Sequence, residues 1–293
     1  MRVINGKNMR FVSFEYRNQA SYGLWKDENN WLRVPDSFLT KYPDLKSVIA
    51  AHQLEALEAA TELSGVPVKA SDARLLPVIP NPGKVFCVGL NYKTHVAEMK
   101  RADSEHPAIF TRFADSLSAH GAPLPKPEAT QRFDFEGELA VIIGKSGRNI
   151  SQAQAWDHIA GYACFNDGTA RDWQRHTHQW TPGKNFPATG PLGPFMASQK
   201  AIPDVNQLTL ESRLNGQVMQ HASVADLIFT LPVIIEYLSG FTHLSPGDVI
   251  ATGTPGGVGD KREPPVYMNE GDVIEVEITG LGTLRNVVTN AGF

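Results

Sequence analysis

The segment Asp134–Ile143, D-F-E-G-E-L-A-V-I-I, constrains the fold of this chain more than any other part of its sequence. Successive side chains of an extended strand point to opposite faces, so Asp134, Glu136 and Glu138 share one face. The apolar run that follows predicts that the end of the strand is buried. The segment therefore predicts a strand that carries carboxylates into the protein interior.

Carboxylates at this spacing repel one another and lose hydration on burial unless a metal ion or basic groups neutralise them. Oxygen ligands alone favour Mg²⁺ or Mn²⁺, with Ca²⁺ as an alternative, over zinc. Asp167 follows a second strand-like run, G-Y-A-C-F-N at 161–166, and is a candidate further ligand. The alternative is a solvated strand face whose charges deter aggregation.

The composition favours a globular protein with a small-molecule ligand. With 293 residues and 42% hydrophobic content, the chain can bury a substantial core, in one large domain or a large and a small one. Its formal net charge of −4 comes without basic runs, which argues against nucleic acid and anionic membranes as partners. No apolar stretch approaches the roughly 20 residues of a membrane span, and the first residues lack the apolar core of a signal peptide. We therefore expect a cytoplasmic protein.

A proline-rich segment at 76–83, L-P-V-I-P-N-P-G, divides the sequence into two unequal parts. Proline cannot continue a helix or a central strand, so we place a domain boundary there. Residues 1–75 are predicted to form a small, β-rich N-terminal domain. Residues 76–293 are predicted to form a larger catalytic domain.

Strand-like runs recur throughout the larger part of the sequence. Helical patterns stand out there only at 152–159 and at 224–240, where apolar residues form a stripe. The expected fold class is therefore α+β and β-dominated.

Two groups of residues suit acid–base and electrostatic catalysis. His95 and Glu98 lie three residues apart, on one face if the segment is helical, and a carboxylate beside an imidazole raises its basicity. They are candidates for activating water, or else form a surface pair. Lys184, in a loop rich in glycine and proline, and Arg171 are candidates for binding a substrate carboxylate or a developing enolate. Exposed salt bridges are the alternative for both.

The glycine-rich segment at 251–259, A-T-G-T-P-G-G-V-G, is similar to a phosphate-binding loop but lacks the Gly-Lys-Ser/Thr ending. We interpret it as a turn whose glycines let the backbone approach a ligand. The hydroxyl group of Thr254 is a candidate ligand contact.

Taken together, these segments resemble the fumarylacetoacetate hydrolase family over residues 76–290. The motifs that carry the resemblance are G-L-N-Y-x-x-H-x-x-E at 89–98, D-F-E-G-E-L-A-V at 134–141, N-D-G-T-A-R-D-W-Q at 166–174, G-K-N-F at 183–186, L-N-G-Q-V-M-Q at 214–220, P-G-D-V-I-A-T-G-T-P-G-G-V-G at 246–259 and G-x-G-T-L-R-N at 280–286. The first 75 residues resemble the small N-terminal domain of many bacterial members, among them acylpyruvases and 2-hydroxyhepta-2,4-diene-1,7-dioate isomerases. The resemblance implies a mixed β-sheet roll of the family's C-terminal type.

The resemblance also implies roles for individual residues. The implied ligands of Mg²⁺ or Mn²⁺ are Glu136, Glu138 and Asp167. The implied water-activating pair is His95 and Glu98. The implied substrate-facing residues are Arg171, Gln174, Lys184 and Thr254. The family often has Asp and then an aromatic residue after its G-K-[SN]-F element, whereas residues 187–189 here are Pro-Ala-Thr, a departure that affects the substrate pocket rather than the metal site.

The hypothesis from the sequence is a divalent-metal-dependent hydrolase that cleaves a C–C bond in an acylpyruvate-type 2,4-dioxo acid, in the catabolism of aromatic or sugar-acid compounds. Glu98, through His95, would deprotonate the attacking water, and Lys184 would stabilise the departing enolate. The alternatives are an isomerase or tautomerase, a hydratase or a decarboxylase of 2-oxo dicarboxylic acids on the same metal site. A more distant alternative is a non-catalytic protein that binds oxo acids. The resemblance further implies a homodimer.

Overall fold

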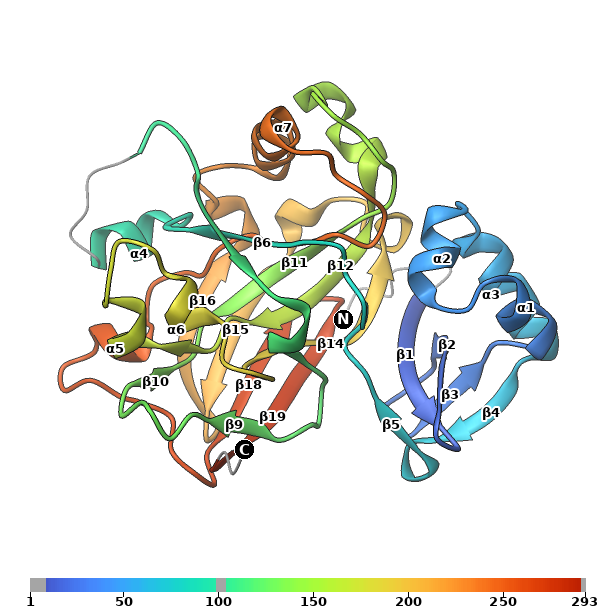
Figure 1. Cartoon of the computed structure of the whole chain (residues 1–293), viewed down its shortest axis with the longest axis horizontal. Coiled ribbons are helices and arrows are strands. Elements are labelled where there is room, and N and C mark those ends of the chain that lie inside the picture. Colours follow the sequence, from blue (N-terminus) through green and yellow to red (C-terminus); the bar gives the residue numbers. More distant parts are fainter. Residues whose placement is uncertain (1–8, 99–103, 291–293) are drawn as a thin grey trace.

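The computed structural model describes residues 9–98 and 104–290 (Figure 1). These residues form mixed β-sheets with few helices, which confirms the predicted β-dominated α+β class. No helix within these two ranges is long and apolar enough to cross a membrane.

The main sheet of the described residues has twelve strands. Ten follow the order β4-β3-β2-β1-β14-β12-β11-β17-β6-β7, while β5 pairs with β1 and β8 with β14. The strands of the N-terminal part are β1 (Arg10–Tyr16), β2 (Gln19–Trp25), β3 (Asn30–Arg33), β4 (Val66–Lys69) and β5 (Ala73–Leu75). The later strands are β6 (Val85–Gly89), β7 (Ala108–Arg112), β8 (Leu117–Ser118), β11 (Gly137–Ile143), β12 (Ile159–Asn166), β14 (Gly190–Ser198) and β17 (Val249–Ala251).

A five-stranded sheet packs beside the main sheet, and a short two-stranded pair completes the strands of the described ranges. The five strands are, in order, β16 (Gln217–Ser223), β15 (Thr209–Leu214), β18 (Val273–Ile278), β19 (Gly282–Asn290) and β9 (Leu124–Lys126). The pair is β10 (Phe133–Asp134) with β13 (Thr169–Ala170).

The helices are short. Those of the N-terminal part are α1 (Asp36–Lys41), α2 (Leu45–Ala50) and α3 (Leu54–Ser64); the later ones are α4 (Lys93–Glu98), α5 (Arg171–Gln174), α6 (Thr181–Lys184) and α7 (Leu231–Phe241). The 3₁₀ helices are η1 (Ala70–Asp72), η2 (Ala114–Ser116), η3 (Gln152–His158), η4 (Gln199–Ala201), η5 (Val205–Gln207), η6 (Val224–Asp226) and η7 (Gly259–Lys261). Helices α4, α5 and α6 lie at the end of the molecule opposite to the N-terminal part (Figure 1).

Two of the predicted helices differ from the structure. The segment at 152–159 forms the 3₁₀ helix η3, not an α-helix. The segment at 224–240 contains η6 and then α7, which begins only at Leu231. Pro232 lies in the first turn of α7, where its missing N–H group costs nothing, so it fixes the start of that helix.

Strand β11 is buried on both faces, which explains its uninterrupted apolar run. Leu139 and Val141 belong to one hydrophobic core, and Ala140 and Ile142 to another on the opposite face of the sheet. A strand in the middle of a sheet covered on both sides has no solvent face, so polar and apolar residues do not alternate. The acidic residues at its start are therefore carried into a buried environment.

The main sheet contains strands from both sides of the proline-rich segment at 76–83. Strand β1 pairs antiparallel with β14, with Arg10 opposite Ala197 and Phe11 opposite Met196. One hydrophobic core contains residues of both parts, among them Phe11 and Val85. The boundary predicted at 76–83 stays a prediction, and strand pairing crosses it.

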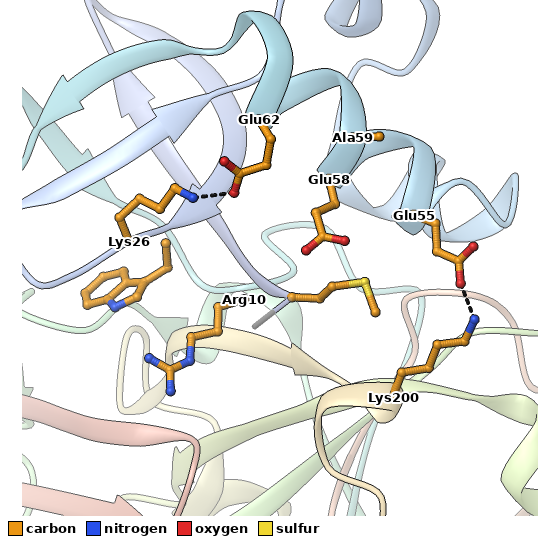
Figure 2. A pocket seen from close by; sticks show the side chains of 9 residues that line it. Arg10, Lys26, Glu55, Glu58, Ala59, Glu62 and Lys200 are labelled. Atoms are coloured by element: carbon orange, nitrogen blue, oxygen red, sulfur yellow. Dashed lines mark hydrogen bonds and ion pairs between the residues drawn. The ribbon is translucent and has the colours of Figure 1, made fainter. Parts of the chain in front are cut away.

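A cavity of about 940 Å³ lies between α3, β1 and η4 (Figure 2). Lys200 of η4 forms an ion pair with Glu55 of α3, and Lys26 forms one with Glu62. These pairs are exposed, so each contributes about 1 kcal/mol or less. None of the predicted site residues lines this cavity.

Candidate active site

The three predicted metal ligands lie close together, at the start of β11 and the end of β12. Glu136 immediately precedes β11, Glu138 lies within it, and Asp167 follows β12. Gly137 pairs with Asn166, and the N–H group of Asp167 donates to the carbonyl oxygen of Glu136 over 2.9 Å. The three side chains are buried, and one oxygen atom of each lies within 4.8 Å of the others.

Asp134 lies outside β11. It ends β10, and β11 begins only at Gly137. Its carboxylate accepts hydrogen bonds from the N–H groups of Gly259, at 2.9 Å, and Asp260, at 3.0 Å. Arg171 lies 2.8 Å from it. Asp134 therefore anchors Arg171 and the segment that contains Gly259.

Lys184 lies between two of the predicted ligands. Its Nζ atom is 2.6 Å from a carboxylate oxygen of Glu136 and 2.6 Å from one of Asp167. Arg171 pairs with the other oxygen of Glu136 at 2.7 Å. Burial alone would raise the pKa of Glu136, but Lys184 and Arg171 outweigh it and lower that pKa to about 2.

Arg112 is a member of this site that the sequence did not reveal. Its Nη1 atom lies 2.5 Å from Asp167, and its Nη2 atom donates to Thr189 Oγ1 over 2.7 Å. Thr189, in the segment that departs from the family pattern, thus contacts Arg112, which in turn pairs with the candidate ligand Asp167. An arginine inside the apolar run A-I-F-T-R-F at 108–113 was the available signal, because a buried guanidinium needs an anionic partner.

Glu138 differs from the other carboxylates because no lysine or arginine of the described residues forms an ion pair with it. The N–H group of Gly253 donates to its Oε2 atom over 2.8 Å. Burial, together with Asp167 and Glu136, raises the pKa of Glu138 well above its usual range.

The charges of this cluster fit a divalent cation. It holds three cations, Arg112, Arg171 and Lys184, and four carboxylates, Asp134, Glu136, Glu138 and Asp167, all nearly inaccessible to solvent. With every carboxylate ionised, the set has one more negative than positive charge, and the raised pKa of Glu138 favours a proton in that place when no metal is bound. A hard cation such as Mg²⁺ or Mn²⁺ would take oxygen ligands from Glu136, Glu138 and Asp167 and compensate the charge of Glu138.

His95 and Glu98 both lie on α4, but no hydrogen bond joins them. Burial lowers the pKa of His95 to about 4, so its imidazole is neutral at pH 7. Neither His95 Nδ1 nor Glu98 Oε1 has a hydrogen-bond partner in the described part of the chain. Glu98 instead accepts, through Oε2, a 2.6 Å hydrogen bond from the N–H group of Gly257.

The glycine-rich segment at 251–259 forms hydrogen bonds with several neighbouring protein groups. Besides the bonds to Glu138 and Glu98, the N–H group of Gly256 donates to Thr94 Oγ1 over 3.1 Å. Thr254 donates its hydroxyl hydrogen to the carbonyl oxygen of Gly137 over 2.9 Å and accepts from Gln220 over 2.7 Å. The glycines thus allow the segment to approach α4 closely.

A cavity of about 410 Å³ opens above the carboxylates. It is smaller than the cavity between α3, β1 and η4, but the candidate site residues His95, Glu136, Glu138, Arg171, Lys184 and Thr254 all line it. Gln174 also lines it and accepts a 3.1 Å hydrogen bond from Arg171 through Oε1. Glu98 and Asp167 do not line it, although both contact residues that support it. The buried cations Arg171 and Lys184, the neutral imidazole of His95 and a cavity of this size suit proton transfer on a small anionic molecule.

Comparison with known proteins places the chain in a family of enzymes. Residues 84–289 match the family model described as "Fumarylacetoacetate (FAA) hydrolase C-terminal". The chain therefore belongs to the fumarylacetoacetate hydrolase family, as its motifs indicated.

Similar proteins include both tautomerases and isomerases. The chain is 41% identical over 300 residues to "Oxaloacetate tautomerase YisK" of Bacillus subtilis (strain 168), covering 96% of this chain and all of that one. Among solved structures, "Fumarylacetoacetate hydrolase (EaFAH)" from psychrophilic Exiguobacterium antarcticum is 33% identical with a TM-score of 0.82, covering 96% and 99% of the two chains. A 2-hydroxyhepta-2,4-diene-1,7-dioate isomerase from Mycobacterium marinum is 29% identical with a TM-score of 0.74, covering 97% and 100%.

Proposed function

We propose that this enzyme is a divalent-metal-dependent keto–enol tautomerase of small 2-oxo acids, with oxaloacetate as the first candidate substrate. The observation that carries the proposal is the 41% identity with an oxaloacetate tautomerase along 96% of the chain. The similar isomerase structure supports the same type of reaction. The tautomerase alternative from the sequence thus has better support than the hydrolase hypothesis.

Tautomerisation requires few groups, and the cavity supplies them. The C3–H bond of the keto acid breaks and an O–H bond forms at the 2-oxo oxygen, with no water consumed. The neutral imidazole of His95 accepts the proton at its unprotonated nitrogen and returns it. Lys184 and Arg171 direct positive charge toward the oxygen on which negative charge develops. A divalent ion on the three carboxylates supplies further positive charge when bound.

The hydrogen bonds of α4 also favour tautomerisation over hydrolysis. The hydrolytic hypothesis needs Glu98 and His95 to act together in deprotonating a water molecule. Glu98 instead accepts a hydrogen bond from Gly257 through Oε2, and no hydrogen bond among the described residues joins it to His95. A single proton acceptor suffices to move a proton between carbon and oxygen.

The test follows the enol of oxaloacetate by its ultraviolet absorbance in the presence of Mg²⁺ or Mn²⁺. We expect the protein to accelerate loss of the enol, and we expect His95→Gln to lower that rate. A parallel assay measures pyruvate released from acetylpyruvate and from oxaloacetate. Pyruvate from acetylpyruvate without enol turnover would support the hydrolase instead, and pyruvate from oxaloacetate would support a decarboxylase.

A further inference from the structure

The lining of the active-site cavity has a polar side formed by one stretch of the chain. Gln174, at the end of α5, and Arg175, Thr177 and His178, from the turn that follows, belong to it. Apolar side chains of Val88, Leu90, Phe110 and Trp180 line the same cavity. The polar side offers hydrogen-bond donors to a ligand that extends from the carboxylate cluster.

This polar side carries an excess of positive charge. Asp260 forms ion pairs with Arg132, Arg175 and Lys261. The pairs with the two arginines are shorter than the pair with the lysine. Among the described residues, none of the three has a second carboxylate partner. Asp260 is ionised, because hydrogen bonds from Arg175 and Tyr267 outweigh the effect of its burial and lower its pKa to about 2. One carboxylate therefore faces three cations.

Arg175 is the member of this cluster that reaches the cavity. It lines the cavity, whereas Arg132 and Lys261 do not. Its side chain is 40% exposed, as is that of Arg132. Deeper in the cavity, Arg171 and Lys184 are already paired with buried carboxylates. A second anionic group on the substrate would thus find in Arg175 a partly exposed cation that shares its one carboxylate, Asp260, with two other cations.

We propose that Arg175, held in place by Asp260, binds the distal carboxylate of a 2-oxo dicarboxylic acid and makes the site selective for dicarboxylates. This inference rests on the proposed tautomerase function and adds the determinant of its substrate class. Arginine suits the role because its planar guanidinium can engage Asp260 and a ligand carboxylate at once.

The kinetic test compares oxaloacetate with acetylpyruvate, which has a methyl ketone where oxaloacetate has its distal carboxylate. We expect Arg175→Gln to lower kcat/KM for enol conversion of oxaloacetate about 10- to 100-fold, as befits loss of a charge-assisted hydrogen bond. The value for acetylpyruvate should change by less than about threefold. Arg132→Gln is the matched control, since it pairs with the same Asp260 at the same exposure without lining the cavity. It should leave both values nearly unchanged.

A binding measurement separates this inference from the proposed reaction. Calorimetric titration of the Mn²⁺-loaded protein compares malate, which has both carboxylates, with oxalate, which reproduces only the 2-oxo carboxylate end. Arg175→Gln should weaken malate about 10-fold or more and leave oxalate unchanged. Arg175→Lys, which keeps the charge, should recover part of the loss.

Each outcome has a defined meaning. If the wild type does not convert oxaloacetate but Arg175→Gln selectively weakens malate, the tautomerase proposal fails and the role of Arg175 stands. If both ligands weaken equally, or Arg132→Gln has the same effect as Arg175→Gln, Arg175 does not recognise a distal carboxylate. Thermal melting of each variant identifies any effect that comes from misfolding.

Discussion

The backbone nitrogen of Gly257 lies 2.6 Å from Oε2 of Glu98 and donates a hydrogen bond to it. Through Gly253, the same glycine-rich segment also donates to Glu138 on β11. It therefore connects α4, which carries His95, to the strand that carries a metal-ligand candidate. We therefore expect the position of His95, the proposed proton acceptor, relative to the carboxylates to depend on this connection.

Replacing Gly256 with alanine should disturb catalysis without disturbing metal binding. A Cβ atom at this position would lie 2.7 Å from Glu98 Oε2 and 3.2 Å from the backbone of Thr94, so the Glu98 carboxylate would have to move and the first turn of α4 to give slightly. We expect kcat to fall roughly 10-fold or more, because misplacement of a catalytic group by about 1 Å costs up to about 100-fold. Mn²⁺ affinity, measured by calorimetry, should stay within about twofold of the wild-type value.

Gly240 in α7 provides the control for this substitution. A Cβ atom there meets nothing within 4 Å, so Gly240→Ala should leave kcat unchanged. It should raise the free energy of unfolding by about 0.5–1 kcal/mol, because alanine has the higher helix propensity. Normal turnover in Gly256→Ala would show that the position of His95 does not depend on the glycine-rich segment.

Replacing Glu138 with glutamine should abolish binding of the divalent cation. The amide keeps the size of the side chain and can still accept the hydrogen bond from Gly253, but it removes the negative charge that a cation requires. Without metal, the variant should melt no lower than the wild type, since an unpaired buried carboxylate is costly. Calorimetry with Mn²⁺ and thermal denaturation measure the two effects. Unchanged Mn²⁺ affinity would remove Glu138 from the site.

Replacing Lys184 with methionine should make stability depend on metal. The substitution removes the cation from Glu136 and Asp167, which lie 2.6 Å from its Nζ atom. We expect the metal-free protein to lose about 3–5 kcal/mol, as when one partner of a buried ion pair is removed. Mn²⁺ should then raise the melting temperature more than it does in the wild type.

Lys200→Met is the matched control for Lys184→Met. Lys200 also pairs with a glutamate, Glu55, but its side chain is 72% exposed. Its loss should cost about 1 kcal/mol or less and leave the Mn²⁺-induced shift unchanged. Equal effects of the two substitutions would mean that Lys184 does not compensate the carboxylates.

The activity should persist at a lower pH than a solvent-exposed histidine would allow. A proton acceptor must be neutral, and burial lowers the pKa of His95 to about 4. We expect kcat to remain high down to about pH 5.5, where a histidine with an ordinary pKa near 6.5 would be mostly protonated. The measurement is kcat against pH with saturating substrate and Mn²⁺, alongside Mn²⁺ affinity at each pH. A fall centred near pH 6.5 with intact metal binding would contradict this pKa.

The sequence could predict the carboxylate cluster because its determinants are local. Glu136 and Glu138 precede an apolar run, and Asp167 ends a strand, so their burial follows from hydrophobic pattern alone. The strand-rich class follows from the same pattern. The face predicted to be shared by Asp134 and Glu136 stays a prediction because β10 ends at Asp134, although Arg171 pairs with both carboxylates.

The groups that neutralise the cluster could not be predicted in the same way. Arg112 lies 55 positions before Asp167 and meets it only because β7 and the segment after β12 meet in the tertiary structure. The bond from Gly257 to Glu98 joins groups 159 positions apart, so the helical spacing of His95 and Glu98 alone suggested a pair. Local spacing constrains which groups can meet but not which long-range partner competes for them.

The pairing of β1 with β14 covers part of an edge of the main sheet. Strand β14 is covered by β8 near its start, at Gly190 and Pro191, and by β1 near its end, at Met196 and Ala197. A chain shortened to residues 76–293 would expose the N–H and C=O groups of that second stretch as an open sheet edge. Exposed edges recruit other strands, so we expect such a fragment to self-associate even with every candidate active-site residue present. In the whole chain, β1 would thus protect the main sheet from aggregation.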